Sequence, residues 1–206
     1  MTIDLKSKLG GDKLFFISYY LFLITSILST TFYYKFFMGR PYMWLQILCV
    51  VLLVAYEYCS NGLRGQNWKG LAVCAALFLI TFRVSHFSTQ RQTVLMFAYI
   101  YCARNIPFAK IARVTLDISI VLVVTTIVSS YFGIIENIAA FKSGRIREYM
   151  GFRYALYLPG QLLNMTALWI YLKKDTITVS GALVWAVANW VVYYQTNSRI
   201  SFFIAE

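Results

Sequence analysis

The sequence predicts an all-α fold: a polytopic bundle of transmembrane helices with about seven spans and the start of an eighth. Two observations support this prediction. Of the 206 residues, 60% are hydrophobic and only 13% are charged, and the mean hydropathy is +0.64, which leaves too little polar surface for a soluble domain. The apolar residues also gather in seven segments, most of them near the roughly 20 residues that a helical span needs.

The first two apolar segments cover residues 14–34 and 42–59. The first is too long for the apolar region of a signal peptide and has no small-residue cleavage site, so we expect an uncleaved span. The third and fourth segments, 71–82 and 93–102, are short. They can cross a membrane only if polar turns extend them, and a paired re-entrant element is the alternative.

The last three complete segments cover residues 114–135, 154–172 and 177–195. Pro159 lies inside the sixth segment, where a missing backbone donor kinks a helix, either for packing or toward a cavity. An eighth apolar segment opens at Ile200 and stops at Glu206. We therefore expect residues 1–206 to be a single integral-membrane domain and a C-terminally incomplete fragment.

The formal net charge is +11, from 19 Lys and Arg against 8 acidic residues. These basic residues are scattered one or two per loop, which indicates loops flanking membrane spans and argues against nucleic-acid binding. With the N-terminus inside, Lys and Arg divide almost equally between the two sides, but arginine dominates the outer set. The four cysteines and one histidine have no metal-ligand spacing, so we expect no metal and no cofactor.

Two stretches hold the candidate site. Residues 142–160 read KSGRIREYMGFRYALYLPG, and residues 196–199 read TNSR after a helical hairpin that returns the chain to the same side. Arginine presents a planar fork that fits phosphate oxygens, so the two stretches together predict an anion-binding surface. The alternative is that these arginines contact lipid headgroups or stabilise helix ends. The candidate anion-binding residues are Arg145, Arg147, Arg153 and Arg199.

The order of these motifs resembles the Wzy-type bacterial capsular and exopolysaccharide polymerases, which are related to the O-antigen ligases. The resemblance rests on R-x-R-x-x-M-G-F at residues 145–152 before one span and T-x-S-R at 196–199 before the next. The segment ARNIPFAKI at 103–111 also resembles a short inner loop of Gram-positive members. Many members have His-Pro-Asn after the Gly-Phe pair; here RYALYLPG follows, and no role of that histidine carries over.

The resemblance implies a membrane glycosyltransferase at the outer face of the bacterial plasma membrane. It would polymerise undecaprenyl-pyrophosphate-linked oligosaccharide repeat units, with membrane lipids and other polysaccharide-assembly proteins as further partners. The four arginines would bind the substrate pyrophosphate. Glu148 is the candidate for the catalytic base, and the alternative is that it pairs with Arg145 three residues before it. Two other readings stay open: a transporter or flippase of an anionic lipid-linked glycan or other solute, and a non-catalytic membrane partner.

Overall fold

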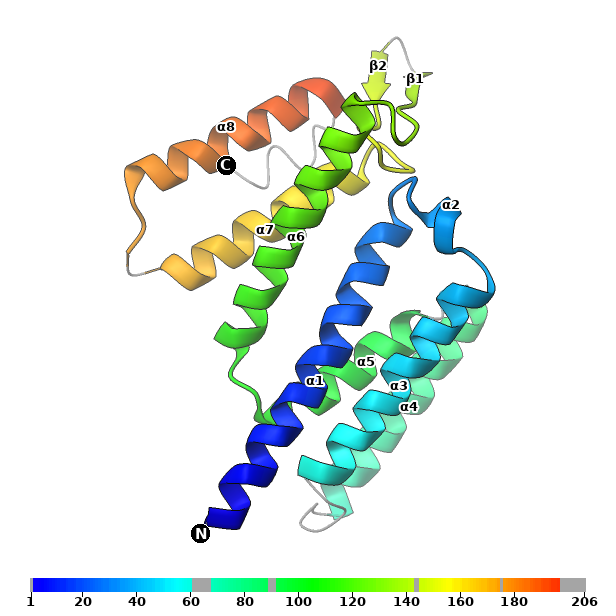
Figure 1. Ribbon diagram of the computed structural model, residues 1–206, viewed down its shortest axis with the longest axis vertical. Coiled ribbons are helices and arrows are strands. Elements are labelled where there is room, and N and C mark those ends of the chain that lie inside the picture. Colours follow the sequence, from blue (N-terminus) through cyan, green and yellow to red (C-terminus); the bar gives the residue numbers. More distant parts are fainter. Residues whose placement is uncertain (1, 61–67, 89–91, 143–144, 175, 197–206) are drawn as a thin grey trace. The chain divides into compact units, whose positions relative to one another are not determined.

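The computed structural model describes residues 2–60, 68–88, 92–142, 145–174 and 176–196, which are mostly helical (Figure 1). The elements in chain order are α1 (Thr2–Ser29), α2 (Tyr34–Phe37), α3 (Arg40–Ser60), α4 (Trp68–Ser88), α5 (Gln92–Cys102), the 3-10 turn η1 (Ala103–Asn105), α6 (Phe108–Tyr131), β1 (Ala139–Lys142), β2 (Arg145–Glu148), α7 (Tyr157–Lys173) and α8 (Val179–Thr196).

Each of the seven predicted apolar segments overlaps one of the longer helices. The first segment differs from α1 at both ends, because α1 begins at Thr2 and not at residue 14, and ends at Ser29 and not at residue 34. The chain turns there, and Thr31 forms an isolated antiparallel bridge with Phe152. The helix α6, which corresponds to the fifth predicted segment, begins at Phe108 and not at residue 114. The hydropathy pattern missed its first turns because they contain basic residues.

The predicted count of seven spans is not supported. Within the described residues, three helices are long and apolar enough to cross a membrane: Asp12–Ser29 of α1, Arg40–Cys59 of α3 and Phe108–Tyr131 of α6. In the part of α4 whose side chains the structure describes, Ala75–Val84 is a shorter apolar stretch. The 11 residues of α5 are about 16 Å long, roughly half of a 30 Å hydrocarbon core.

The last two predicted spans also fall short of these criteria. The helix α7 has 17 residues, and the 18 residues of α8 include the polar Asn189 and Gln195. They do form the helical hairpin that the sequence predicted, since α7 and α8 pack against each other (Figure 1).

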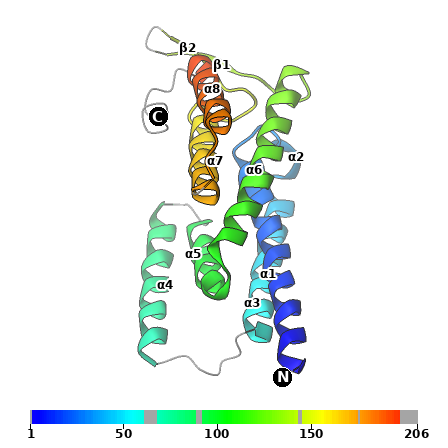
Figure 2. The ribbon, with the colours of Figure 1, turned by 90° about the vertical axis from the view of Figure 1, so that its left-hand side faces the viewer.

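The chain divides into two compact units, and the prediction of a single integral-membrane domain stays a prediction. Unit 1 is Met1–Phe22 with Pro41–Phe108, and it contains α3, α4, α5 and the first part of α1. Here α4 packs beside α5 (Figure 2), and aromatic rings join α1 to α5. Phe22 stacks on Tyr99 with 4.6 Å between ring centroids, and Phe15 lies 6.1 Å from the same ring.

Buried hydroxyl groups also join the helices of unit 1. The Ser18 Oγ donates to the Cys49 carbonyl at 3.0 Å and lies 2.6 Å from the Tyr99 hydroxyl, which itself donates to the Ser18 carbonyl at 2.9 Å. Ser18 and Tyr99 are both buried. A buried hydroxyl without a partner would be costly, so these mutual bonds select one arrangement of α1, α3 and α5.

Unit 2 is Leu23–Arg40 with Ala109–Glu206. Its core joins α6, α7, α8 and the loop between β2 and α7. The buried apolar residues of this core are Leu116, Val123, Met150, Phe152, Leu158, Leu162, Met165 and Val192. Phe152 is fully buried although it lies in a loop, so the loop is part of the packed core.

Between α6 and α7 the chain forms a β-hairpin that the sequence did not predict. The strands β1 and β2 are antiparallel, with Ala140 opposite Arg147 and Phe141 opposite Ile146. Segments of four residues are too short for a clear alternating pattern, and the hydropathy of the neighbouring helices hides them. This hairpin carries most of the predicted site.

Candidate functional site around the hairpin

The segment Met150-Gly151-Phe152 anchors the site. It is the end of the R-x-R-x-x-M-G-F motif that contributes to the family resemblance. Met150 and Gly151 both have positive φ, 47° and 84°. A Cβ on Gly151 would lie 2.8 Å from Ile135 Cδ1 and 3.0 Å from the Thr126 carbonyl oxygen, so only glycine fits against α6 at this point. The structure therefore gives this motif a packing role.

Two backbone hydrogen bonds tie this segment to the chain that follows α1. Phe32 N–H donates to the Gly151 carbonyl, and Arg153 N–H donates to the Thr30 carbonyl, both at 2.9 Å. The phenol of Tyr33 donates to Ser129 Oγ at 2.6 Å. The C-terminal ends of α1 and α6 and the start of the α7 segment are thereby held together in unit 2.

Arg153 lies at this junction and stabilises the end of α1. Its guanidinium is 3.9 Å from the centre of the Tyr34 ring, and its Nη1 donates to the Ser29 carbonyl at 3.3 Å. A cation beside the last carbonyls of a helix complements the helix dipole. This contact matches the helix-end alternative that the sequence left open; an added role in anion binding stays a prediction.

Strand alternation sorts the remaining hairpin positions onto two faces. Register pairs Lys142 with Arg145 and Ala140 with Arg147, so these four positions share one face. Phe141, Ile146 and Glu148 belong to the other face. Arg145 and Glu148 therefore lie on opposite faces of a strand, and the spacing that would pair them on a helix does not apply.

Arg147 is the predicted site residue with an unmet hydrogen-bonding group. Its side chain is half-buried, and its Nε is buried with no hydrogen-bond partner among the described residues. Buried polar groups in folded proteins nearly always have a partner, so an exception indicates a place where a ligand or another chain can supply one. An anion would satisfy both the Nε donor and the positive charge.

Arg199, the fourth predicted arginine, lies outside the described residues. The α7–α8 hairpin does bring the end of α8 back to the region of the predicted site, because α8 lies against β2. Within the helical hairpin, the amide of Asn189 donates to Thr166 Oγ1 at 3.2 Å and to the Trp185 carbonyl at 2.9 Å. The NH2 group of this amide joins α7 to α8, so the structure gives Asn189 a role in helix packing.

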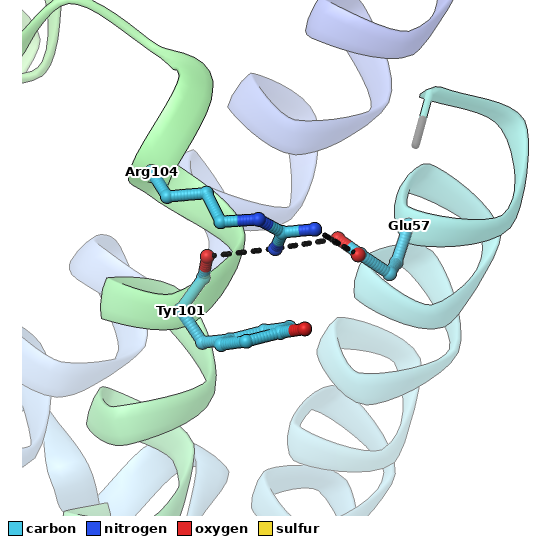
Figure 3. Close-up of polar contacts among 3 residues, drawn as sticks. All are labelled: Glu57, Tyr101 and Arg104. Atoms are coloured by element: carbon cyan, nitrogen blue, oxygen red, sulfur yellow. Dashed lines mark hydrogen bonds and ion pairs between the residues drawn. The ribbon is translucent and has the colours of Figure 1, made fainter. Parts of the chain in front are cut away.

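The sequence missed a polar cluster in unit 1, shown in Figure 3. The structure pairs Glu57 with Arg104. Arg104 Nη1 lies 3.2 Å from Glu57 Oε2, with a second bond from Nη2 to Oε1, and the guanidinium stacks 4.3 Å from the centre of the Tyr101 ring. The hydrogen bond to Glu57 raises the pKa of Arg104.

No sequence signal could have identified this ion pair, because 47 residues separate its members. The other ion pair, between Lys35 and Glu136, joins α2 to the loop after α6 in unit 2 and is more exposed. Within the described residues, no three side chains of His, Cys, Asp or Glu come together as metal ligands would. Comparison of the chain with protein-family models, curated proteins and solved structures finds no match.

Proposed function

We propose that this chain is a multi-pass membrane protein that binds the pyrophosphate of a lipid-linked glycan at the hairpin face of Arg147. In this proposal it serves glycan polymerisation at the outer face of a bacterial plasma membrane, with more of its helices in the bilayer than the three of span length. The observation that carries the proposal is the buried Nε of Arg147, which has no partner among the described residues and lies on a face that also includes positions Lys142 and Arg145.

The chemistry of such a transfer explains why this face would be basic. A hydroxyl of the acceptor sugar attacks the anomeric carbon of the donor, and the bond from that carbon to the pyrophosphate oxygen breaks. The electron pair leaves with the pyrophosphate, and guanidinium groups close to that oxygen stabilise the developing charge without a metal ion. The acceptor hydroxyl also loses a proton to a base.

We do not assign that base to Glu148. Its carboxylate position is on the face of β2 opposite to Arg147, so a substrate on the arginine face would not reach both groups directly. Arg153 is assigned a positioning role in this proposal, because its guanidinium already contacts Ser29 and Tyr34. It holds the junction from which the hairpin projects.

The test is binding of farnesyl pyrophosphate to the purified chain in lipid nanodiscs, with farnesol as the uncharged comparison. Arg147→Ala should weaken pyrophosphate binding roughly tenfold or more, the loss expected for a charge-assisted hydrogen bond. Arg147→Lys should recover only part of it, because lysine keeps the charge and loses the fork. Lys173→Ala, which removes an exposed charge at the end of α7, is the matched control.

Equal affinity for farnesyl pyrophosphate and farnesol would overturn the proposed pyrophosphate site. The polymerase role has a separate test in cells, where Arg147→Ala and Arg199→Ala should abolish polymer while membrane abundance is unchanged. Normal polymer ladders on a gel from both variants would reject that role even if the purified chain binds pyrophosphate.

A further inference from the structure

A second feature of unit 2 is a group of large apolar side chains that no described residue covers. Phe132 is 78% exposed, Phe141 76% and Phe36 75%, and Met38, Ile134 and Ile146 are also exposed. We call these six residues the apolar rim. They lie on α2 and directly after it, on the turn after α6, and on the face of the hairpin opposite to Arg147.

The apolar rim begins where two span-length helices end. The span of α1 ends at Ser29 and that of α6 at Tyr131. The Tyr33–Ser129 hydrogen bond and the Lys35–Glu136 ion pair hold the segments after these helices at a common level. If both helices cross a bilayer, the residues that follow them lie where hydrocarbon gives way to headgroups. Interfacial segments bury apolar side chains such as Phe and Leu at that boundary.

The charge of the same two segments favours an anionic bilayer surface. Residues 32–40 and 131–153 contain six basic positions, Lys35, Arg40, Lys142, Arg145, Arg147 and Arg153, against the two acids Glu136 and Glu148, a net charge of +4. Basic groups beside apolar side chains match a headgroup layer with hydrocarbon beneath it. The hairpin also has one apolar and one basic face, since its register places Phe141 and Ile146 on the face opposite to the basic positions.

We propose that the apolar rim inserts into the interfacial layer of the bilayer, with the basic positions among anionic phospholipid headgroups. The hairpin then lies on the membrane surface, with Phe141 and Ile146 toward the acyl chains and the face of Arg147 turned away from them. This inference depends on α1 and α6 crossing the membrane and does not depend on glycan transfer.

The test uses single-cysteine variants in a background whose native cysteines are alanine, each labelled with the environment-sensitive fluorophore NBD. The labelled positions are Phe141→Cys and Ile146→Cys on the apolar rim, Ala140→Cys on the opposite hairpin face, and Val121→Cys on the exposed side of α6. The protein is reconstituted into phosphatidylcholine vesicles, with or without phosphatidylglycerol. Nitroxide lipids then quench the label either near the headgroup or near the end of the acyl chain.

We expect both rim labels to be quenched best by the shallow nitroxide, and the label at Val121 by the deep one. The label at Ala140 should be quenched less than the label at Phe141. Removing phosphatidylglycerol should lower rim quenching by roughly twofold or more, because the basic positions lose their anionic partners.

Two results would overturn the inference in different ways. Deep quenching at Val121 with unquenched labels at both rim positions would place the rim in water or, if NBD emission is blue-shifted, beneath another protein. Absence of quenching at Val121 as well would reject the membrane crossing of α6, on which the proposed function also depends. A failure confined to the rim leaves the pyrophosphate-binding proposal standing.

Discussion

The two units of this chain differ in the pairing of their polar groups among the described residues. In unit 1 the polar side chains bond to one another: Ser18 and Tyr99 share their hydroxyl bonds, and Arg104 is matched by Glu57 and Tyr101. In unit 2 some polar groups are also paired, as Asn189 is with Thr166, but the Nε of Arg147 is buried without a partner in the described residues, and Phe141 on the opposite face of the hairpin is strongly exposed. Satisfied polar groups stabilise a fold, whereas unsatisfied ones indicate where something else binds.

This comparison predicts that unit 2 depends on backbone packing in a loop, and that unit 1 depends on side-chain bonds between helices. The first prediction has the largest expected effect. Gly151→Ala should lower the free energy of unfolding by about 2–4 kcal/mol, because the new Cβ would clash with Ile135 and with the Thr126 carbonyl at a positive φ. Thermal unfolding in detergent measures the change.

The control for Gly151 is Gly160→Ala. Gly160 lies in α7 and has no atom within 4 Å of an added Cβ. Alanine there should be neutral or stabilise by up to about 1 kcal/mol, because glycine is a poor helix residue. Equal effects of the two substitutions would show that the loop is not the packed anchor of unit 2.

A second prediction sharpens the account of unit 1. Tyr99→Phe removes one buried hydroxyl and should cost about 1–2 kcal/mol of unfolding free energy. Ser18→Ala should cost a similar amount. In the double variant the two losses should overlap by about 1 kcal/mol, because the hydroxyls lie 2.6 Å apart. Strictly additive losses in this double-mutant cycle would mean that the two groups do not act together.

The smallest expected effect separates the two ion pairs. Glu57→Gln in unit 1 should cost about 1 kcal/mol, because Arg104 loses a two-bond partner that is largely shielded from solvent. Glu136→Gln in unit 2 should cost no more than about 0.5 kcal/mol, since the Lys35–Glu136 pair is more than half exposed. Unfolding at low and high salt checks this prediction. The loss of unfolding free energy should change less with salt for Glu57→Gln than for Glu136→Gln.

Hydropathy by itself located the helices. All seven predicted segments overlap helices, because a long apolar run in a chain with so few charged residues is a local property that needs no knowledge of distant contacts. It did not give the number of spans, since α5 is recognisable as helical although its 11 residues are too few to cross. Length and charge content, not helix formation, decide that question.

The tertiary structure alone decided what the candidate residues touch. The sequence placed Arg153 in an anion site, and folding brings it to the Ser29 carbonyl, which is 124 residues away in the chain. Folding also pairs Ala139–Lys142 with Arg145–Glu148 as two strands whose two faces separate Arg147 from Glu148. It makes Gly151 a packing residue and pairs Glu57 with Arg104. Each of these outcomes depends on contacts between segments far apart in sequence, which local composition and spacing do not encode.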